Sequence, residues 1–262
     1  MKLRIYFFTF LFAILSYNGT AQSTHVIEPS VLEVTYKTDC KYGLAKGCNE
    51  DVYTLRCGKN VSEYINQFTL WFDSLSCSSD PILQDIPLQR FEDSFKQSSS
   101  PSKQIPKSPG KLEYLYNNLE KGKISVYTGI MGSHYRILEE IPKFKWQLSE
   151  NTTKNIIGYD CMMATTTFRG RQWTAWYTMD IPLSLGPWKF GGLPGLILLV
   201  ECKDFISIEA VGLKTKGLAP VTFYNFHNYK FENIDRVKYL RIKTNSSTYP
   251  KGTKMTPTME LE

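Results

Sequence analysis

Residues 186–200, "GPWKFGGLPGLILLV", place rigid and permissive backbone positions side by side, directly before the most apolar run of the chain. Six of the first ten positions are glycine or proline: Gly186, Pro187, Gly191, Gly192, Pro194 and Gly195. The prolines fix φ near −65° and disfavour helix in the residue before each, while the glycines tolerate positive φ. The stretch therefore predicts a single fixed path of the chain. Leu196–Val200 is apolar without alternation, which is typical of a central strand buried on both faces.

The large side chains of this loop have two interpretations. In the first interpretation, the loop packs its apolar side chains into the end of a sheet, since apolar residues beside a buried strand are usually core. These side chains are Trp188, Phe190 and Leu193. In the second they form one wall of a cleft, and Lys189 or the backbone N–H groups face a ligand. We treat all four as candidate ligand- or partner-binding residues.

Strand patterns dominate the rest of the chain. Alternating or β-branched segments occur at 31–37, 51–58, 66–75, 173–180 and 206–212. The short turns of the second half require antiparallel pairing, because a parallel crossover takes a dozen or more residues. We predict a mainly β fold: a curved, half-barrel-like antiparallel meander with one or two helices against its concave side. Residues 85–97, with Asp85 as cap and Pro87 in the first turn, are the clearest helix candidate.

The ends of the chain and one internal segment are expected to lie outside the fold. Residues 1–21 have the basic start, short apolar core and small residues of a secretory signal peptide. We expect one domain over 22–248, with a flexible Ser/Pro-rich insertion at 96–111 and a disordered tail at 249–262. No later apolar run reaches transmembrane length. The predicted location is the periplasm, the outer membrane surface or the extracellular space.

Charge and cysteine content narrow the class of protein. Removing Lys2 and Arg4 lowers the formal net charge from +6 to +4, and the remaining basic residues form no stripe, so nucleic-acid binding is not expected. All six cysteines follow the signal peptide, which favours disulfides. Their pairing is open, with Cys40 and Cys48 the best candidates for a local bridge.

Residue types that carry chemistry are sparse. The three histidines lie in no known catalytic or metal-binding motif, so we predict no catalytic residue, metal or cofactor. The arginines of "RGRQW", Arg169 and Arg171, could grip a carboxylate or phosphate at a hairpin tip. They could equally be solvated turn charges. With Trp176 of the next segment, they complete the set of candidate binding residues.

The chain resembles a known family. "GLPGLI" at 192–197 is the signature that names the GLPGLI family, and residues 55–75, 135–182 and 186–201 resemble its successive blocks in order. The resemblance covers about Val31 to Gly212. It implies an exported protein of bacteria that have an outer membrane, and it implies no reaction.

The sequence therefore favours an exported envelope protein that binds without catalysing a reaction. Its partner would be an apolar or peptide-like ligand or an outer-membrane protein. A secreted hydrolase with scattered catalytic residues is the alternative, and a purely structural assembly protein is another. The sequence does not predict an oligomeric state.

Overall fold

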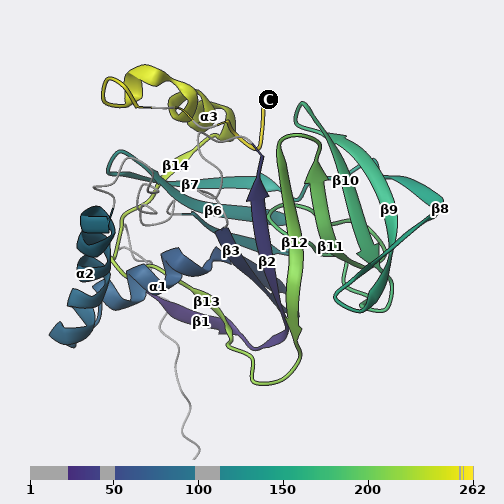
Figure 1. Cartoon of the computed structure of the whole chain (residues 1–262), viewed down its shortest axis with the longest axis horizontal. Helices are drawn as coiled ribbons and strands as arrows, with labels where there is room; N and C mark the ends of the chain where they lie inside the picture. Colours follow the sequence, from purple (N-terminus) through teal and green to yellow (C-terminus); the bar gives the residue numbers. More distant parts are fainter. Residues whose placement is uncertain (1–22, 42–50, 98–112, 254, 256, 262) are drawn as a thin grey trace, which may run out of the picture.

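The structure is a computed structural model and describes residues 23–41, 51–97, 113–253, 255 and 257–261. The predicted signal peptide, Cys48 and nearly all of the predicted insertion at 96–111 lie outside these residues. The described residues form fourteen strands, three α-helices and one 3₁₀ helix (Figure 1). The strands are β1 (His25–Glu28), β2 (Ser30–Cys40), β3 (Asp51–Gly58), β4 (Val61–Asn66), β5 (Glu113–Asn118), β6 (Lys123–Ile130), β7 (Ser133–Glu140), β8 (Gln147–Ile156), β9 (Tyr159–Phe168), β10 (Arg171–Thr178), β11 (Leu196–Cys202), β12 (Ile206–Lys214), β13 (Val221–Phe223) and β14 (Glu232–Ile234). The helices are α1 (Gln67–Ser76), α2 (Pro81–Gln97), α3 (Arg236–Thr244) and the 3₁₀ helix Ser246–Thr248.

Twelve strands form one curved sheet, as predicted. Its order is β14-β7-β6-β5-β4-β3-β2-β12-β11-β10-β9-β8. The sheet consists of two antiparallel meanders, β2 to β7 and β8 to β12, joined where β2 pairs with β12. One pair departs from the antiparallel expectation, because β14 runs parallel to β7. A separate pair, β1 with β13, lies beside this sheet (Figure 1).

The two faces of the sheet carry different apolar clusters. Neighbours in sequence alternate between them: Leu115 belongs to the larger cluster, whereas Tyr114 and Tyr116 belong to the smaller one. The smaller cluster includes Val221 and Phe223 of β13, so the β1–β13 pair covers that face. The larger cluster includes every residue of Leu196–Val200, so at β11 it extends over both faces. Along β4, β5 and β6 it lies on the face opposite to the β1–β13 pair, because successive side chains of a strand point to opposite faces. We call this the inner face.

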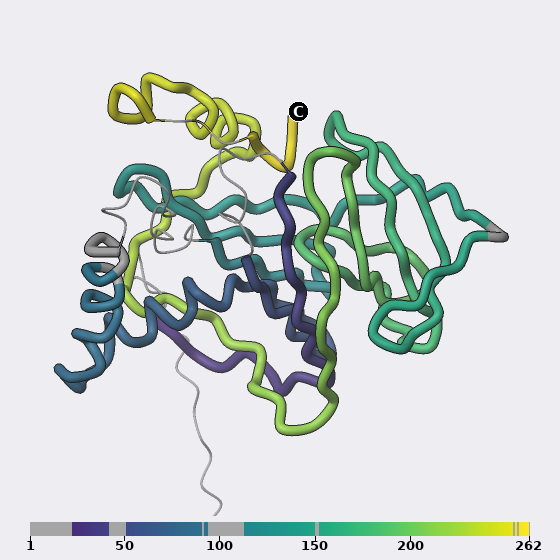
Figure 2. The backbone as a smooth tube through the Cα atoms, viewed as in Figure 1, coloured from purple at the N-terminus to yellow at the C-terminus, as the bar shows by residue number. Residues whose placement is uncertain are grey.

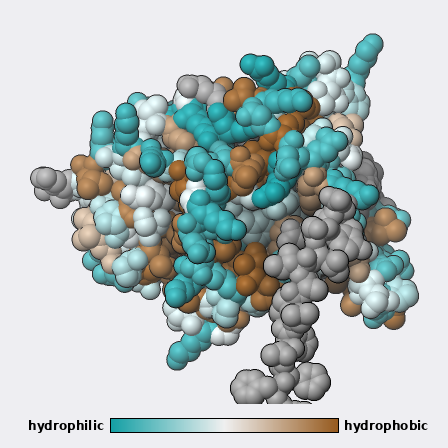
Figure 3. Space-filling view, turned by 180° about the vertical axis from the view of Figure 1, so that it is seen from behind, coloured by the Kyte–Doolittle hydropathy of each residue, from teal (hydrophilic) through white to brown (hydrophobic). Residues whose placement is uncertain are grey.

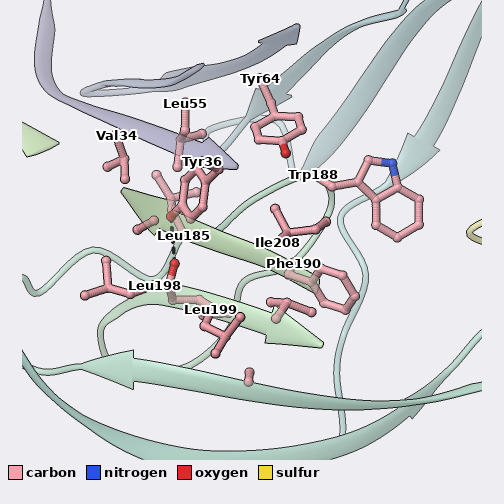
Figure 4. Close-up of a cluster of buried hydrophobic side chains, with 14 of the residues drawn as sticks. Val34, Tyr36, Leu55, Tyr64, Leu185, Trp188, Phe190, Leu198, Leu199 and Ile208 are labelled. Carbon is pink, nitrogen blue, oxygen red and sulfur yellow. Dashed lines mark hydrogen bonds between the residues drawn. The ribbon is translucent and has the colours of Figure 1, made fainter. Parts of the chain in front are cut away.

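The glycine-rich loop leads into a buried strand, as predicted. All five residues of Leu196–Val200 are at most 2% exposed. The backbone of Ile197 accepts a hydrogen bond from the Tyr36 hydroxyl of β2 at 2.6 Å, drawn dashed in Figure 4. Glycine is required at Gly195, where an added Cβ would overlap the Thr178 carbonyl oxygen. It also suits Gly192, whose φ is +79°.

Helices account for the main errors of the strand prediction. Of residues 66–75, predicted to be a strand, all but Asn66 belong to α1, because Asn66 Oδ1 accepts from Thr69 N at 3.0 Å and caps a helix there. Helix α2 was predicted but begins four residues earlier than Asp85, so Pro87 lies inside it. Helix α3 contributes Tyr239 to the inner-face cluster, which brings the α-helices to three.

The described cysteines do not support the disulfide prediction. No disulfide joins any two of Cys40, Cys57, Cys77, Cys161 and Cys202. Three of these side chains are buried in the sheet, where a thiol behaves as a small apolar group: Cys57, Cys161 and Cys202. The predicted bridge from Cys40 to Cys48 lies partly outside the described residues.

Candidate functional site

Four buried charged side chains form a closed arrangement on the inner face, which we call the salt-bridge ring: Glu139, Arg169, Lys189 and Glu260. Arg169 donates from Nη2 to Glu139 Oε2 at 2.5 Å and from Nη1 to Glu260 Oε2 at 2.6 Å. Lys189 Nζ lies 2.5 Å from Glu260 Oε1 and 2.5 Å from Glu139 Oε1. Each cation therefore contacts both carboxylates.

The ring connects parts of the chain that are far apart in the sheet. Glu139 lies on β7, next to one end of the twelve-strand order, and Arg169 lies in the turn between β9 and β10 near the other end. Arg169 and Gly170 have φ values of +48° and +76°. Positive φ at both positions is the requirement of a type I′ hairpin turn, as predicted for a tight turn here. The sheet therefore curls so that its two ends meet through these charges.

The electrostatics of the ring favour its charged state. Burial alone would raise the pKa of Glu260, but Lys189 and Arg169 outweigh burial and hold that pKa below its usual value. Burial alone would likewise lower the pKa of Arg169, and Glu260 and Glu139 reverse this. Arg236 of α3 adds a further donor, from Nη1 to Glu260 Oε2 at 2.8 Å. Glu260 is thus held ionised although it is buried.

Residues 257–261, which we call the tail segment, carry Glu260 into this position. Leu261 N donates to Arg169 O at 3.1 Å, and Arg171 Nη2 donates to Thr258 O at 2.8 Å. The Arg171 guanidinium also lies 3.6 Å from the Phe205 ring centroid. The sequence predicts a disordered tail at 249–262; in the described residues 257–261, the ion pairs of Glu260 and the packing of Met259 against the larger apolar cluster hold the chain. Figure 2 shows it returning to the end of β2.

A cavity of about 120 Å³, which we call the central cavity, lies on the inner face beside the tail segment. Its walls come from β2, β3, β4, β5, β12, α3, the glycine-rich loop and the tail segment. The lining residues are Thr38, Cys40, Asp51, Tyr53, Tyr64, Asn66, Glu113, Trp188, Ile206, Ile208, Lys243, Pro257, Thr258 and Met259. A smaller cavity of about 60 Å³ shares Glu113, Trp188, Lys243, Thr258 and Met259 with it.

The central cavity contains polar groups without good partners. The Thr38 Oγ1 and Tyr64 hydroxyls lie close to each other and have no other hydrogen-bond partner among the described residues, and each residue is only 5% exposed. Burial raises the pKa of Tyr64 well above its usual value, and Thr38 is close enough to oppose this shift slightly. Figure 4 shows the Tyr64 hydroxyl pointing toward Trp188. Because unsatisfied buried polar groups cost free energy, two of them at one cavity indicate a place where a ligand can bond.

The structure places the predicted site residues in five different environments. Trp188 lines both cavities, with φ of +54°, and Lys189 belongs to the salt-bridge ring. Phe190 and Leu193 are core: Phe190 is 4.8 Å from the Trp173 ring. Of the remaining candidates, Arg169 belongs to the ring, and Arg171 of β10 donates to the tail segment. Trp176 has Lys154 Nζ 5.8 Å from its ring centroid and lines neither of the two cavities described above.

The glycines and prolines of the loop have structural roles. Gly186 and Gly191 allow close approach: an added Cβ would lie 2.8 Å from Ile197 Cβ and 2.9 Å from Ser184 O, respectively. The Pro187 carbonyl accepts from Phe190 N at 3.1 Å, which closes a turn around Trp188. Pro194 precedes Gly195 at the entry to β11. These residues fix the direction in which Trp188 and Lys189 leave the backbone.

Several residues of the site carry no signal in the sequence. Glu139 has a neighbouring carboxylate in sequence but no recognisable partner, and Glu260 lies in a segment without apolar pattern. Asp51 and Glu113 are the first residues of β3 and β5 and lie apart from every motif. Besides Trp188 and Lys189 of the loop, the prediction that Arg169 grips a carboxylate pointed toward this site, and the carboxylates it contacts belong to the same chain.

A second group of chemical side chains lies at the end of α1. Cys77 Sγ is 3.2 Å from His227 Nδ1, and His227 Nε2 is 3.4 Å from Asp73 Oδ1. The sulfur is also only 3.7 Å from Nε2, so it does not lie along the lone pair of either nitrogen. Burial raises the pKa of Cys77, and Asp73 raises it further. Cys77 also caps the carbonyl end of α1, which disfavours a thiolate. This arrangement does not favour a nucleophile.

Figure 3 shows the side opposite to Figure 1, where apolar residues are interrupted by polar ones. No group of three or more His, Cys, Asp or Glu side chains in the described part of the chain is arranged to hold a metal ion. Within the same residues, no helix combines the length and apolar character that crossing a membrane requires.

The described residues form a mainly β fold with a cavity on the inner face of its sheet, and comparisons with known proteins add one family match and a likeness of fold. Residues 169–199 match a family described as "Protein of unknown function (Porph_ging)". That match spans the hairpin turn with Arg169, the glycine-rich loop and most of β11. No curated protein matches the chain.

Two solved structures of a protein named PNGF-II, in C2 and P21 space groups, are similar to this chain. Both have 15% sequence identity to it, with TM-scores of 0.51 and 0.52. The similarity covers 80% and 81% of this chain but only 32% and 33% of those chains. At this identity the likeness concerns the fold alone.

Proposed function

We propose that this protein is a binding protein whose central cavity receives a small apolar or peptide-like group. The observation that carries the proposal is the pair of buried, unsatisfied hydroxyls, Thr38 and Tyr64, on the wall of a cavity that also has aromatic walls. Small-molecule sites typically combine apolar and aromatic walls with a few converging polar groups. No arrangement of catalytic side chains lines the same cavity.

The size of the cavity limits what it holds. A cavity of about 150 Å³ is known to accept benzene, so the 120 Å³ here suits a group of about five or six heavy atoms. That is the size of one amino-acid side chain. A larger ligand would place one such group inside and keep the rest at the surface.

The walls are held rigid before any ligand arrives. Trp188 is fixed by the turn from Pro187 to Phe190, and the tail segment is fixed by Glu260 in the salt-bridge ring. A preformed site loses little conformational entropy on binding. The strained φ of Trp188, +54°, is the kind of local cost that functional sites retain.

The setting of this activity is the cell envelope. The signal-peptide pattern of residues 1–21 supports export, and the glycine-rich loop supports membership of the GLPGLI family, with which the match at 169–199 is compatible. Fractionation of cells that make the full chain, with N-terminal sequencing of the product, tests export. An uncleaved product in the cytoplasm would contradict it.

Binding can be tested with a small neutral probe, 1-butanol, whose five heavy atoms suit the cavity. We expect it to shift NMR signals of Trp188 and Ile208 selectively. Ile208→Phe fills the cavity and should abolish these shifts, whereas Val211→Phe, on the same strand but 52% exposed, should keep them. Met259→Trp fills the cavity from the tail segment if Ile208→Phe does not fold. Shifts that scatter over the surface, or that survive both filled variants, would refute the proposal.

A further inference from the structure

We propose that the central cavity selects a primary ammonium group on a short apolar stem. The inference rests on the proposed function and names the chemical class of its ligand. Lysine side chains and free peptide N-termini both present this chemistry. The evidence is the charge, the aromatic walls and the hydrogen-bonding capacity of the lining residues.

Two carboxylates line the cavity without a cation of their own. Neither Asp51 nor Glu113 forms an ion pair with any described residue, in contrast to Glu139 and Glu260 a short distance away. Both carboxylates are close enough to Tyr53 to act on its hydroxyl. Burial raises the pKa of the Tyr53 hydroxyl, and the negative charges of Glu113 and, to a smaller extent, Asp51 raise it further. Unpaired carboxylates at the wall of a cavity favour a positively charged occupant.

The basic residues nearby do not neutralise this pair. Lys243 also lines the cavity, but its Nζ lies 5.5 Å from the Tyr239 ring centroid and makes no ion pair with either carboxylate. Two carboxylates and one ammonium leave the lining with a charge of −1. Lys189 lies beside the smaller cavity and is held by the salt-bridge ring.

The walls of the cavity suit a cation in two further ways. Tyr53 and Tyr64 stack with ring centroids 4.8 Å apart, and Trp188 lies on another wall. Aromatic faces attract ammonium groups. The Thr38 and Tyr64 hydroxyls have lone pairs that no donor uses with good geometry. An ammonium group has three donors and no acceptor, so these hydroxyls and the carboxylates can satisfy it, whereas a carboxylate ligand would be repelled.

The test compares three probes of nearly equal size by NMR titration at pH 7: n-butylammonium, 1-butanol and butyrate. We expect n-butylammonium to bind at least tenfold more tightly than 1-butanol and butyrate not to bind. Glu113→Gln should lower the affinity for n-butylammonium at least tenfold and leave the affinity for 1-butanol unchanged. Glu209→Gln, an exposed acidic position on β12, is the matched control and should change neither.

Two peptide probes then separate the sources of the ammonium group. N-acetyl-lysine N-methylamide carries it on a side chain, and alanine N-methylamide carries it at the N-terminus. Whichever binds more tightly identifies the source. If Glu113→Gln does not fold, Asp51→Asn replaces it in the same comparison.

The outcomes distinguish this inference from the proposed function. If 1-butanol binds in the cavity as tightly as n-butylammonium, or if butyrate binds more tightly, the ammonium inference is wrong and the cavity remains a site. If none of the three probes binds, both are wrong. An n-butylammonium affinity that both Glu113→Gln and Asp51→Asn leave unchanged would also overturn the inference.

Discussion

Lys189 Nζ and Glu260 Oε1 lie 2.5 Å apart although the two residues are 71 positions apart in the chain. Lys189 is 6% exposed and Glu260 is 5% exposed, so the pair is shielded from water. It fixes the glycine-rich loop to the tail segment, and these two segments supply adjoining walls of the central cavity. Stability and binding are therefore coupled at this pair.

Removing one carboxylate of the salt-bridge ring should destabilise the protein strongly. Glu260→Gln leaves Arg169 and Lys189 with a single shared carboxylate, and breaking a buried pair in this way costs about 3–5 kcal/mol. Glu140→Gln is the control, because Glu140 pairs with Lys123 at the surface and contributes about 1 kcal/mol or less. Urea denaturation of both variants measures the difference. Equal midpoints for the two variants would contradict this account of the ring.

The contribution of Glu260 should depend on pH in a defined direction. Its pKa is lower in the folded protein than in the unfolded chain, so the unfolded state binds the proton more tightly. The stabilisation is therefore fully present above a pH of about 4.5 and is lost as the pH falls through the folded-state pKa. The stability difference between wild type and Glu260→Gln should shrink below that pH. A difference that stays constant down to pH 3 would show that the pKa of Glu260 is not lowered.

Gly195 should not tolerate a side chain. Its added Cβ would overlap the Thr178 carbonyl oxygen, and the backbone of β10 cannot move without disturbing β11. Gly195→Ala should cost about 3 kcal/mol or more, at or beyond the upper range for overpacked interiors. Gly212→Ala is the matched control, since its nearest neighbour would be Thr35 Cβ at 3.9 Å. Thermal unfolding that is alike for both variants would count against the close approach.

The thiol of Cys77 should react slowly near neutral pH. Burial and Asp73 raise its pKa, so the thiolate fraction at pH 7 is smaller than for an ordinary cysteine. Alkylation by iodoacetamide, followed by peptide mass spectrometry, should be slower at pH 7 than alkylation of a cysteine in the unfolded chain, and its rate should rise as the pH increases. The variant His227→Ala should leave the rate at pH 7 within about threefold, because His227 is not aligned to take the proton. Rapid labelling at pH 7 that depends on His227 would instead support the hydrolase alternative.

The sequence predicted those parts of the fold that depend on local pattern. Pro187, Pro194 and Gly195 specify the loop, and the unbroken apolar run of Leu196–Val200 specifies a strand covered on both faces. The meander follows from the short turns, of which Arg169-Gly170 is one. Residues 66–75 were predicted wrongly because aromatic and β-branched content favours strands, whereas a single cap at Asn66 starts a helix.

The candidate site was harder to predict because its parts meet only in the folded chain. Trp188 and Lys189 were identified as candidates from their loop, but Glu139, Glu260, Asp51 and Glu113 come from four distant segments. A charged residue has no periodic signal that reveals a partner 71 or 91 positions away. Placing these residues requires the curvature of the sheet, which brings β7 close to the β9–β10 turn.

The two meanders are held together in the sheet by the pairing of β2 with β12. A chain severed between β7 and β8 would yield two fragments, each a meander, and separating them would expose the edges of β2 and β12 that pair in the intact sheet. Unpaired edges associate readily, and here their registers match over eight residue pairs. The two fragments should therefore recombine into a nicked but native-like molecule, so this fold is suited to split-reporter engineering.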